Sequence, residues 1–180
     1  MKELSLNILD IAENSVKAGA SLTEIKIDED EERLTLTITD DGCGMTAEVL
    51  KSVTDPFYTT RTTRKVGMGI PLLKLEAEMT GGKLEITSRC DSEYPDSHGT
   101  EVKAVFNKKH IDFTPLGDVS ESIATLIQGH PETDFLFTHN TGGKRITLDT
   151  REIKRILDGV PINSYEVINW IKEYLNEQYS

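Results

Sequence analysis

The stretch "ITDDGCGM", residues 38–45, ends an alternating strand pattern with two aspartates followed by two glycines. Leu36 and Ile38 alternate with threonines, which predicts a strand with one buried face. Glycines placed after a strand often let the backbone approach a phosphate group. Asp40 and Asp41 would repel a phosphate, so this stretch requires either a different ligand or none.

Two interpretations of this stretch need no unusual ligand. "GCGMTA" (residues 42–47) matches a G-x-G-x-x-A dinucleotide fingerprint, follows a strand and precedes a helix. That fingerprint requires an acidic residue about 20 residues further on, at the end of the next strand. The corresponding region, "FYTTRTTRK", has neither an acid nor a strand pattern, which disfavours a dinucleotide site. A plain tight turn remains the other interpretation.

A third interpretation is that Asp40 faces a base. The exocyclic amino group of a purine donates hydrogen bonds, and a buried carboxylate accepts them. Gly42 and Gly44 would then let the backbone pass beside a flat ring. A separate phosphate site is needed, and "KVGMGIP" (residues 65–71) supplies two glycines at a helix start. Basic residues precede those glycines: Arg61, Arg64 and Lys65.

Residues 3–18 are predicted to form a helix that ends at Gly19. Four polar residues of this helix share one face because they are spaced by three, four and three: Asn7, Asp10, Asn14 and Lys17. Such a face is either solvated or suited to a magnesium-bound triphosphate, since Mg²⁺ prefers oxygen ligands and needs few from protein.

The order of predicted elements up to residue 109 is helix, hairpin, short helix, loop, helix and hairpin. This order favours an α/β fold with helices layered on one face of a mixed sheet. The short helix is expected to be capped by Thr46.

Residues 110–180 are expected to form a second, smaller α+β unit. It comprises a helix capped by Asp118, a hairpin around "HNTGGK", and two helices capped by Thr150 and Ser164. Its larger apolar residues would either form a small core or dock on the first domain: Phe135, Phe137, Trp170, Tyr174 and Leu175.

The composition excludes several classes of protein. The 180 residues carry a net charge of −11, which argues against a general nucleic-acid binder. Two cysteines suit neither a disulfide scaffold nor a four-thiolate zinc site, and Cys43 is expected to be a packing residue. The four histidines, at 98, 110, 130 and 139, are expected at the surface. No apolar stretch approaches the roughly 18 residues of a membrane span, and no signal peptide opens the chain, so we expect a soluble cytoplasmic protein.

Five motifs together resemble the GHKL ATPase superfamily, which includes sensor histidine kinases, DNA gyrase, heat-shock chaperones and the mismatch-repair protein MutL. They are "ENSVKAGA", "DDGCGM", "DPFYTTR", "VGMGIPLLK" and "HGTEVKAVF", in the family's order and spacing over roughly residues 1–107. The resemblance implies a Bergerat-type two-layer α/β sandwich that binds ATP and Mg²⁺ beneath a lid. It covers residues 1–109 as one domain and leaves 110–180 as an extension of unknown role.

The resemblance also assigns roles to individual residues. Asn14 corresponds to the magnesium ligand, Lys17 to a phosphate contact, and Asp40 to the adenine-binding aspartate. The residues expected at the nucleotide are Asn14, Lys17, Asp40, Gly42, Gly44, Met45, Thr59, Thr60, Arg61, Lys65, Gly67, Met68, Gly69 and Thr100. Thr59, Thr60 and Arg61 fall where the lid begins.

Two departures from the family pattern bear on activity. Lys65 replaces the first glycine of the usual lid motif, and Asp10 stands where the ATPases commonly have Glu. We therefore expect Asp10 to be the catalytic residue that handles the attacking water, with slow hydrolysis.

The expected function is a cytoplasmic regulatory kinase that transfers the γ-phosphate of ATP to a partner protein. The alternative is a nucleotide-loaded switch that hydrolyses ATP slowly and transfers no phosphate. No membrane contact is expected, and a homodimer is possible. A MutL-like role on DNA is disfavoured by the acidic charge and the short chain.

Overall fold

The computed structural model describes residues 3–54 and 69–180. Its strands form one six-stranded sheet in the order β3-β4-β2-β1-β5-β6. The elements in chain order are α1 (Leu4–Lys17), β1 (Leu22–Glu29), β2 (Arg33–Asp40), α2 (Ala47–Ser52), α4 (Gly69–Met79), β3 (Lys83–Arg89), β4 (Gly99–Asn107), α5 (Val119–Gly129), β5 (Asp134–Thr141), β6 (Lys144–Asp149), α6 (Thr150–Leu157) and α7 (Tyr165–Tyr179).

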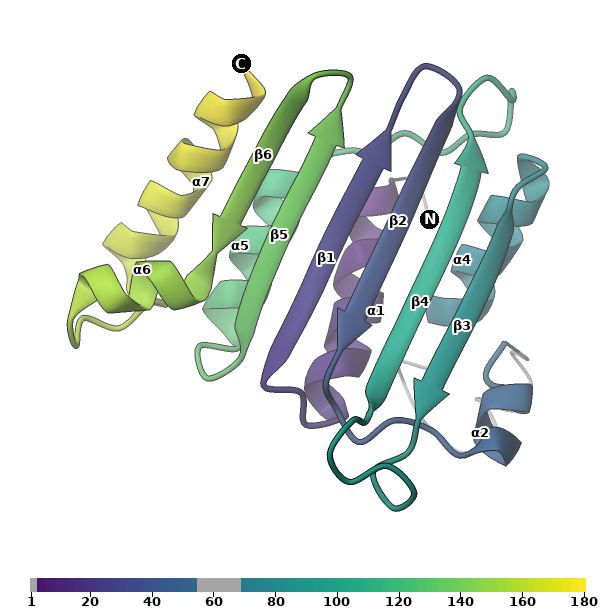
Figure 1. Cartoon of the computed structure of the whole chain (residues 1–180). Coiled ribbons are helices and arrows are strands. Elements are labelled where there is room, and N and C mark those ends of the chain that lie inside the picture. The colour runs from purple at the N-terminus through teal and green to yellow at the C-terminus, as the bar shows by residue number, and fades with distance from the viewer. Residues whose placement is uncertain (1–2, 55–68) are drawn as a thin grey trace.

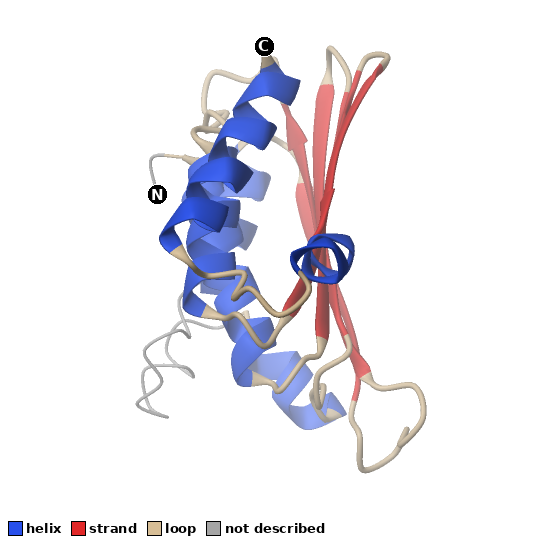
Figure 2. Cartoon of the chain, turned by 90° about the vertical axis from the view of Figure 1, so that its left-hand side faces the viewer, coloured by secondary structure: helices blue, strands red, loops and turns tan. Residues whose placement is uncertain are grey.

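The sheet is mixed, and the long helices cover one of its faces. β1 pairs with β5 in parallel, whereas the β1–β2, β2–β4, β3–β4 and β5–β6 pairs are antiparallel. Helices α1, α4, α5 and α7 lie on one side, and α6 lies beside the β6 edge (Figure 1, Figure 2). This arrangement confirms the predicted two-layer α/β fold.

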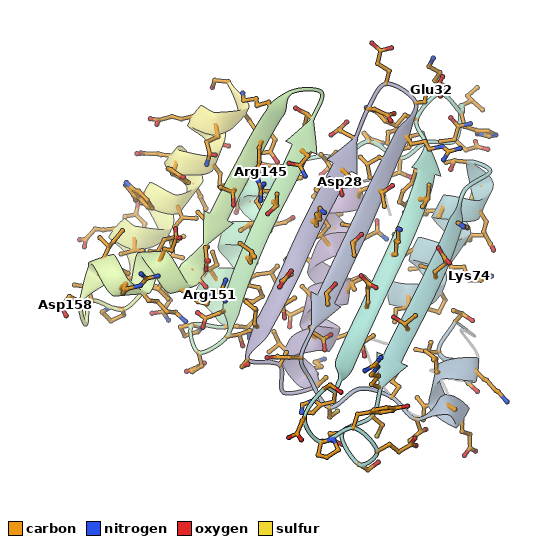
Figure 3. All side chains as sticks on the ribbon, viewed as in Figure 1. Asp28, Glu32, Lys74, Arg145, Arg151 and Asp158 are labelled. Carbon is orange, nitrogen blue, oxygen red and sulfur yellow. The ribbon has the colours of Figure 1, made fainter. Side chains whose placement is uncertain are left out.

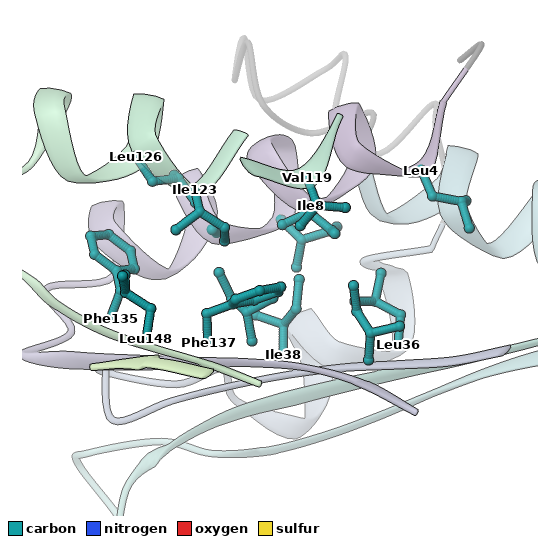
Figure 4. Packing of buried hydrophobic residues seen from close by; sticks show 14 of the residues in the cluster. Leu4, Ile8, Leu36, Ile38, Val119, Ile123, Leu126, Phe135, Phe137 and Leu148 are labelled. Carbon is teal, nitrogen blue, oxygen red and sulfur yellow. The ribbon is translucent and has the colours of Figure 1, made fainter. Parts of the chain in front are cut away.

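The strands alternate between a buried face and a polar one, as predicted for β2. Leu36 and Ile38 are buried and lie beneath Leu4 and Ile8 of α1 (Figure 4). The opposite face carries polar side chains and is not covered by any described helix; Asp28 and Arg145 lie on it (Figure 3). The functional residues that face the helices are therefore held between the two layers.

The segment after residue 110 extends the same sheet and the same core. β5 lies beside β1 with Phe137 opposite Ile25, and Phe135 and Phe137 pack below α5 (Figure 4). Both phenylalanines belong to the hydrophobic cluster that contains Ile8 of α1. Of the two interpretations, docking on the first domain is therefore the one observed for these residues.

Trp170 and Tyr174 depart from the expected small core. Their rings stack on each other, with centroids 5.1 Å apart, and both remain partly exposed on α7. The buried residues of α7 are instead its aliphatic ones: Val167, Ile168, Ile171 and Leu175. Helix α7 thus packs on the hydrophobic core through its aliphatic stripe, and the aromatic pair lies at the edge of that stripe.

The prediction for His139 was wrong, because this residue is only 2% exposed. It continues the inward alternation of Phe135 and Phe137 on β5. Its Nε2 bonds the carboxylate of Glu29, and its Nδ1 lies 2.7 Å from the hydroxyl of Tyr179. Two polar partners compensate the burial of its ring nitrogens. The other three histidines are partly exposed.

Two further local predictions require correction. Cys43 is exposed and does not pack in the core. Helix α6 is capped by Asp149, whose carboxylate accepts the backbone N–H of Arg151, and Thr150 is the first helical residue. Thr150 donates its hydroxyl to Asp134 instead. Thr46 and Asp118 do cap α2 and α5, whereas Ser164 occupies the N-cap position of α7 without a side-chain hydrogen bond.

Within residues 3–54 and 69–180, the helices are all too short or too polar to cross a membrane.

Candidate functional site

Polar side chains gather on the helix-facing side of the sheet, at the end where β2 stops and β4 begins. Four of them form a row across neighbouring strands in the order Ser88, Thr100, Asp40 and Thr23. Each lies two residues from the last inward-facing apolar residue of its strand. Side chains at every second position of a strand share a face, so all four face the helices. A buried sheet face therefore ends in a row of hydroxyls and one carboxylate.

Asp40 is held by two donors, one at each carboxylate oxygen. The hydroxyl of Ser15 on α1 donates to its Oδ2 at 2.7 Å, and the backbone N–H of Gly42 donates to its Oδ1 at 2.9 Å. A carboxylate has about four acceptor positions, so lone pairs remain for a further donor. The carboxylate is thus fixed in orientation and half-buried, with acceptor capacity left.

Ser15 is a residue of the site that the sequence analysis did not identify. It is buried among the apolar residues of α1, and its hydroxyl points at Asp40. A small polar residue within an apolar helix stripe, one position after Asn14, is the signal that could have identified it.

Ser88 is a second residue that the sequence analysis did not identify, and it joins Met45 to this row and contacts Thr100 within it. The Ser88 hydroxyl lies 2.7 Å from that of Thr100, and it accepts the backbone N–H of Met45 at 2.8 Å. Thr23, on the other side of Asp40, buries a hydroxyl oxygen that has no hydrogen-bond partner among the described residues. An unsatisfied buried hydroxyl costs free energy and is a common mark of a ligand position.

Asp41 serves the fold, which resolves the puzzle of adjacent aspartates. It accepts the backbone N–H groups of Ser21 and Leu22 and the hydroxyl of Ser21. Partial burial opposes its ionisation, but these hydrogen bonds outweigh burial and hold the pKa of Asp41 below its usual range. Asp41 thereby ties the end of β2 to the start of β1, and Asp40 alone faces the site.

Gly42 and Gly44 allow the chain to pass close to its own neighbours. A Cβ at Gly42 would lie 2.8 Å from the Cβ of Ala18, and one at Gly44 would lie 1.9 Å from the carbonyl oxygen of Arg89. Gly44 also has φ of 74°, which side chains disfavour. Both glycines are therefore required by packing within the protein, whatever ligand lies beside them.

The polar stripe of α1 becomes more exposed along its length. Asn7 is fully buried, and its side chain has no hydrogen-bond partner within residues 3–54 and 69–180. Asp10 and Asn14 are half-buried, and Lys17 is exposed. The stripe faces the start of α4, since a Cβ at Gly69 would lie 3.2 Å from the Cβ of Asp10. The solvated-face interpretation therefore fails for Asn7 and holds only for Lys17.

Asp10 is a titratable group of this stripe whose pKa is shifted by its surroundings. Burial first, and the neighbouring charge of Glu13 second, raise the pKa of Asp10 above its ordinary value. A carboxylate with a raised pKa is a better proton acceptor than an exposed one. Its position beside the N-terminus of α4 places it where an anionic ligand would meet the helix dipole.

The oxygen atoms on this stripe fit a magnesium ion that is coordinated mainly by phosphate oxygens and water and only partly by protein. Asn14 offers an amide oxygen and Asp10 a carboxylate, both accessible and one helical turn apart. Within the described ranges, no group of three His, Cys, Asp or Glu side chains could hold a metal ion. Mg²⁺ commonly takes one or two protein oxygens and completes its shell with phosphate oxygens and water.

Six of the predicted nucleotide contacts lie outside the described residues, and for these the assignment stays a prediction: Thr59, Thr60, Arg61, Lys65, Gly67 and Met68. The described members lie around one end of the sheet, at the end of α1, the turn after β2 and the starts of α4 and β4.

Comparisons with known proteins agree with this geometry. Residues 2–110 match the family model described as histidine kinase-, DNA gyrase B-, and HSP90-like ATPase. The chain is 29% identical over 94 residues to sensor protein KdpD of Clostridium acetobutylicum, covering 49% of this chain and 10% of that protein. It is 26% identical over 113 residues to a putative sensor histidine kinase NtrY-like of Rickettsia conorii, covering 62% of this chain and 18% of that protein. The chain thus spans less than a fifth of the length of these relatives.

Solved structures share the fold. The Aquifex aeolicus MutL ATPase domain complexed with ADP superposes with a TM-score of 0.51 at 15% identity, covering 88% of this chain and 70% of that chain. The N-terminal domain of a DNA repair protein gives a TM-score of 0.55 at 16% identity, covering 83% and 53%. Because the family model matches more than half of the residues, the chain belongs to the histidine kinase-, DNA gyrase B- and HSP90-like ATPase family.

Proposed function

We propose that the protein binds ATP with Mg²⁺ at the end of the sheet marked by Asp40, and that it acts as a regulatory kinase on a partner protein. The observation that carries this proposal is the carboxylate of Asp40, oriented by Ser15 and Gly42 with acceptor positions to spare. Family membership supports the nucleotide, and the two sensor-kinase relatives support phosphate transfer.

Asp40 would recognise adenine through its exocyclic amino group. That group donates hydrogen bonds, whereas guanine carries an acceptor at the equivalent ring position, so the carboxylate favours ATP over GTP. The Thr23 hydroxyl, which has no hydrogen-bond partner in the described part of the chain, lies next to Asp40 in the cross-strand row and would give a second polar contact to the base or to a bound water.

The polar stripe of α1 would hold the phosphates and the metal. Asn14 would offer its amide oxygen to Mg²⁺, and Lys17 is an exposed cation one turn away. Gly69 begins the eleven-residue helix α4, whose N-terminal N–H groups favour phosphate. Bound Mg²⁺ would neutralise phosphate charge, and residues 59–68 would complete the cradle as predicted from the sequence.

Asp10 would orient or deprotonate the group that attacks the γ-phosphate. Its raised pKa and its position beside Gly69 suit this role. Its side chain is one methylene shorter than glutamate, and a displacement near 1 Å can cost on the order of 100-fold in rate. Slow intrinsic hydrolysis follows, which preserves ATP until a partner arrives.

Incubation with γ-labelled ATP in a lysate of the native host tests the kinase. Label on a partner protein that is present with the wild type and absent with the Asp40→Asn variant supports phosphate transfer. Bound and slowly hydrolysed nucleotide without a labelled protein would replace the kinase with the alternative, a nucleotide-loaded switch. If the wild type does not retain ATP, both the kinase and the switch are excluded.

A further inference from the structure

His98 lies beside the glycine turn that follows β2, residues 42–44. It belongs to the loop between β3 and β4, which lies at the same end of the sheet as that turn (Figure 1). A Cβ at Gly99 would lie 2.0 Å from the carbonyl oxygen of Asp40, so the start of β4 touches the end of β2 directly. This close approach brings the preceding residue, His98, to the turn.

The ring of His98 holds one peptide group of the glycine turn. Its Nδ1 lies 2.5 Å from the carbonyl oxygen of Gly42. A carbonyl oxygen can only accept a hydrogen bond, so Nδ1 carries the proton in this contact. The same peptide group donates its N–H, that of Cys43, to the carbonyl oxygen of Ala18 at 2.9 Å. Because the C=O and N–H of a trans peptide point in opposite directions, His98 and the end of α1 hold this group from two sides.

Gly42 depends on such contacts because it has no side chain to restrict its own backbone. Its N–H donates to Oδ1 of Asp40 at 2.9 Å, and the peptide group on its other side is the one that His98 holds. A Cβ at Gly42 would lie 2.8 Å from the Cβ of Ala18, so α1 leaves the turn little room to move inward. The contact with His98 opposes movement in the other direction.

We propose that His98 is a positioning residue of the nucleotide site. By holding the peptide group between Gly42 and Cys43 against α1, it keeps the Gly42 N–H on Asp40 and the carboxylate aimed at adenine. This clamp is a property of the protein without nucleotide, whereas its effect on ATP rests on the proposed function.

Loss of the contact loosens the turn and weakens ATP binding together. A neutral hydrogen bond corresponds to about a 5-fold change in an equilibrium. We therefore expect His98→Ala to speed hydrogen exchange of the Gly42 and Cys43 amides about 5-fold, and to lower ATP affinity about 5-fold.

Two amide variants separate the hydrogen bond from the bulk of the ring. The amide nitrogen of asparagine is as many bonds from Cα as Nδ1 of histidine, whereas that of glutamine corresponds to Nε2. His98→Asn should restore slow exchange and ATP affinity, and His98→Gln should not. His110→Ala is the matched control, because His110 follows the far end of β4 and should leave both quantities unchanged.

NMR of the full chain without nucleotide measures amide exchange and tests the clamp. Unchanged exchange in His98→Ala, or identical exchange in the two amide variants, would overturn it. If the alanine variant does not fold, the comparison of the amide variants still decides.

Calorimetry with Mg-ATP tests the effect on the nucleotide. Faster exchange without a loss of ATP affinity would overturn the positioning role. In an Asp40→Asn background, His98→Ala should cost no further affinity, because it acts through Asp40; an additive loss would overturn that route. If the wild type binds no ATP, the proposed function fails, while the exchange rates still decide the clamp.

Discussion

Replacement of Asp40 by Asn is expected to remove most of the ATP affinity while leaving the fold intact. An asparagine keeps the size of the side chain and one oxygen that can accept the Gly42 N–H. Its amide nitrogen would face the Ser15 hydroxyl, which can accept a hydrogen bond as well as donate one. The local contacts therefore survive, but the charge and one acceptor are lost.

The magnitude follows from the contact with the base. A hydrogen bond to a charged group contributes about 1.5–3 kcal/mol, so ATP affinity should fall about 10- to 100-fold. If the amide nitrogen faces the adenine amino group, two donors meet and the loss lies at the upper end.

Isothermal calorimetry with Mg-ATP and Mg-GTP measures the effect, with thermal unfolding as a check of the fold. Asp96→Asn is a matched control, because Asp96 is an exposed carboxylate in the loop between β3 and β4. We expect Asp96→Asn to bind ATP like the wild type, and GTP to bind weakly to all three proteins. Unchanged ATP affinity in Asp40→Asn, with an unchanged unfolding temperature, would refute the assignment of this end of the sheet.

Asp10→Glu should raise and Asp10→Asn should lower the rate of phosphate release from ATP; identical rates would show that Asp10 does not handle the water. Because the pKa of Asp10 is raised in the fold, its ionisation costs stability as the pH rises through the unfolded and then the folded pKa. Asp10→Asn should therefore melt at a higher temperature than the wild type at about pH 7, with the difference fading near about pH 3, where both states are protonated; a constant difference would contradict this. The pKa of Asp41 is lowered, so its contribution is present at neutral pH and lost as the pH falls through the folded pKa; Asp41→Asn should lower the melting temperature at about pH 7 but not in acid. Tyr179→Phe removes the hydroxyl partner of buried His139 and should cost about 1 kcal/mol, or about 2–4 °C in melting temperature, without changing ATP affinity; a shift in affinity would mean that this contact couples to the site.

Local patterns in the sequence determined most of the secondary structure and the character of each face. The alternation of Leu36 and Ile38 with threonines placed β2, and the spacing of Asn7, Asp10 and Asn14 placed a polar stripe on α1. Both follow from the repeat of the backbone, which sets the direction of each side chain from its neighbours alone. The order of motifs determined the family, and with it the two-layer fold.

Only the tertiary structure decided which segments meet, because contacts between residues far apart in sequence leave no periodic signal. Ser15 meets Asp40 across 25 positions, and β5 joins β1 in parallel, which buries the histidine of β5 beside Glu29. The same holds for the turn after β2 and the end of β3, where the backbone N–H of Asp91 donates to the carbonyl of Cys43. Their approach depends on a glycine that lets two backbones touch, and a clash removed by a missing Cβ is visible only once both segments are in place.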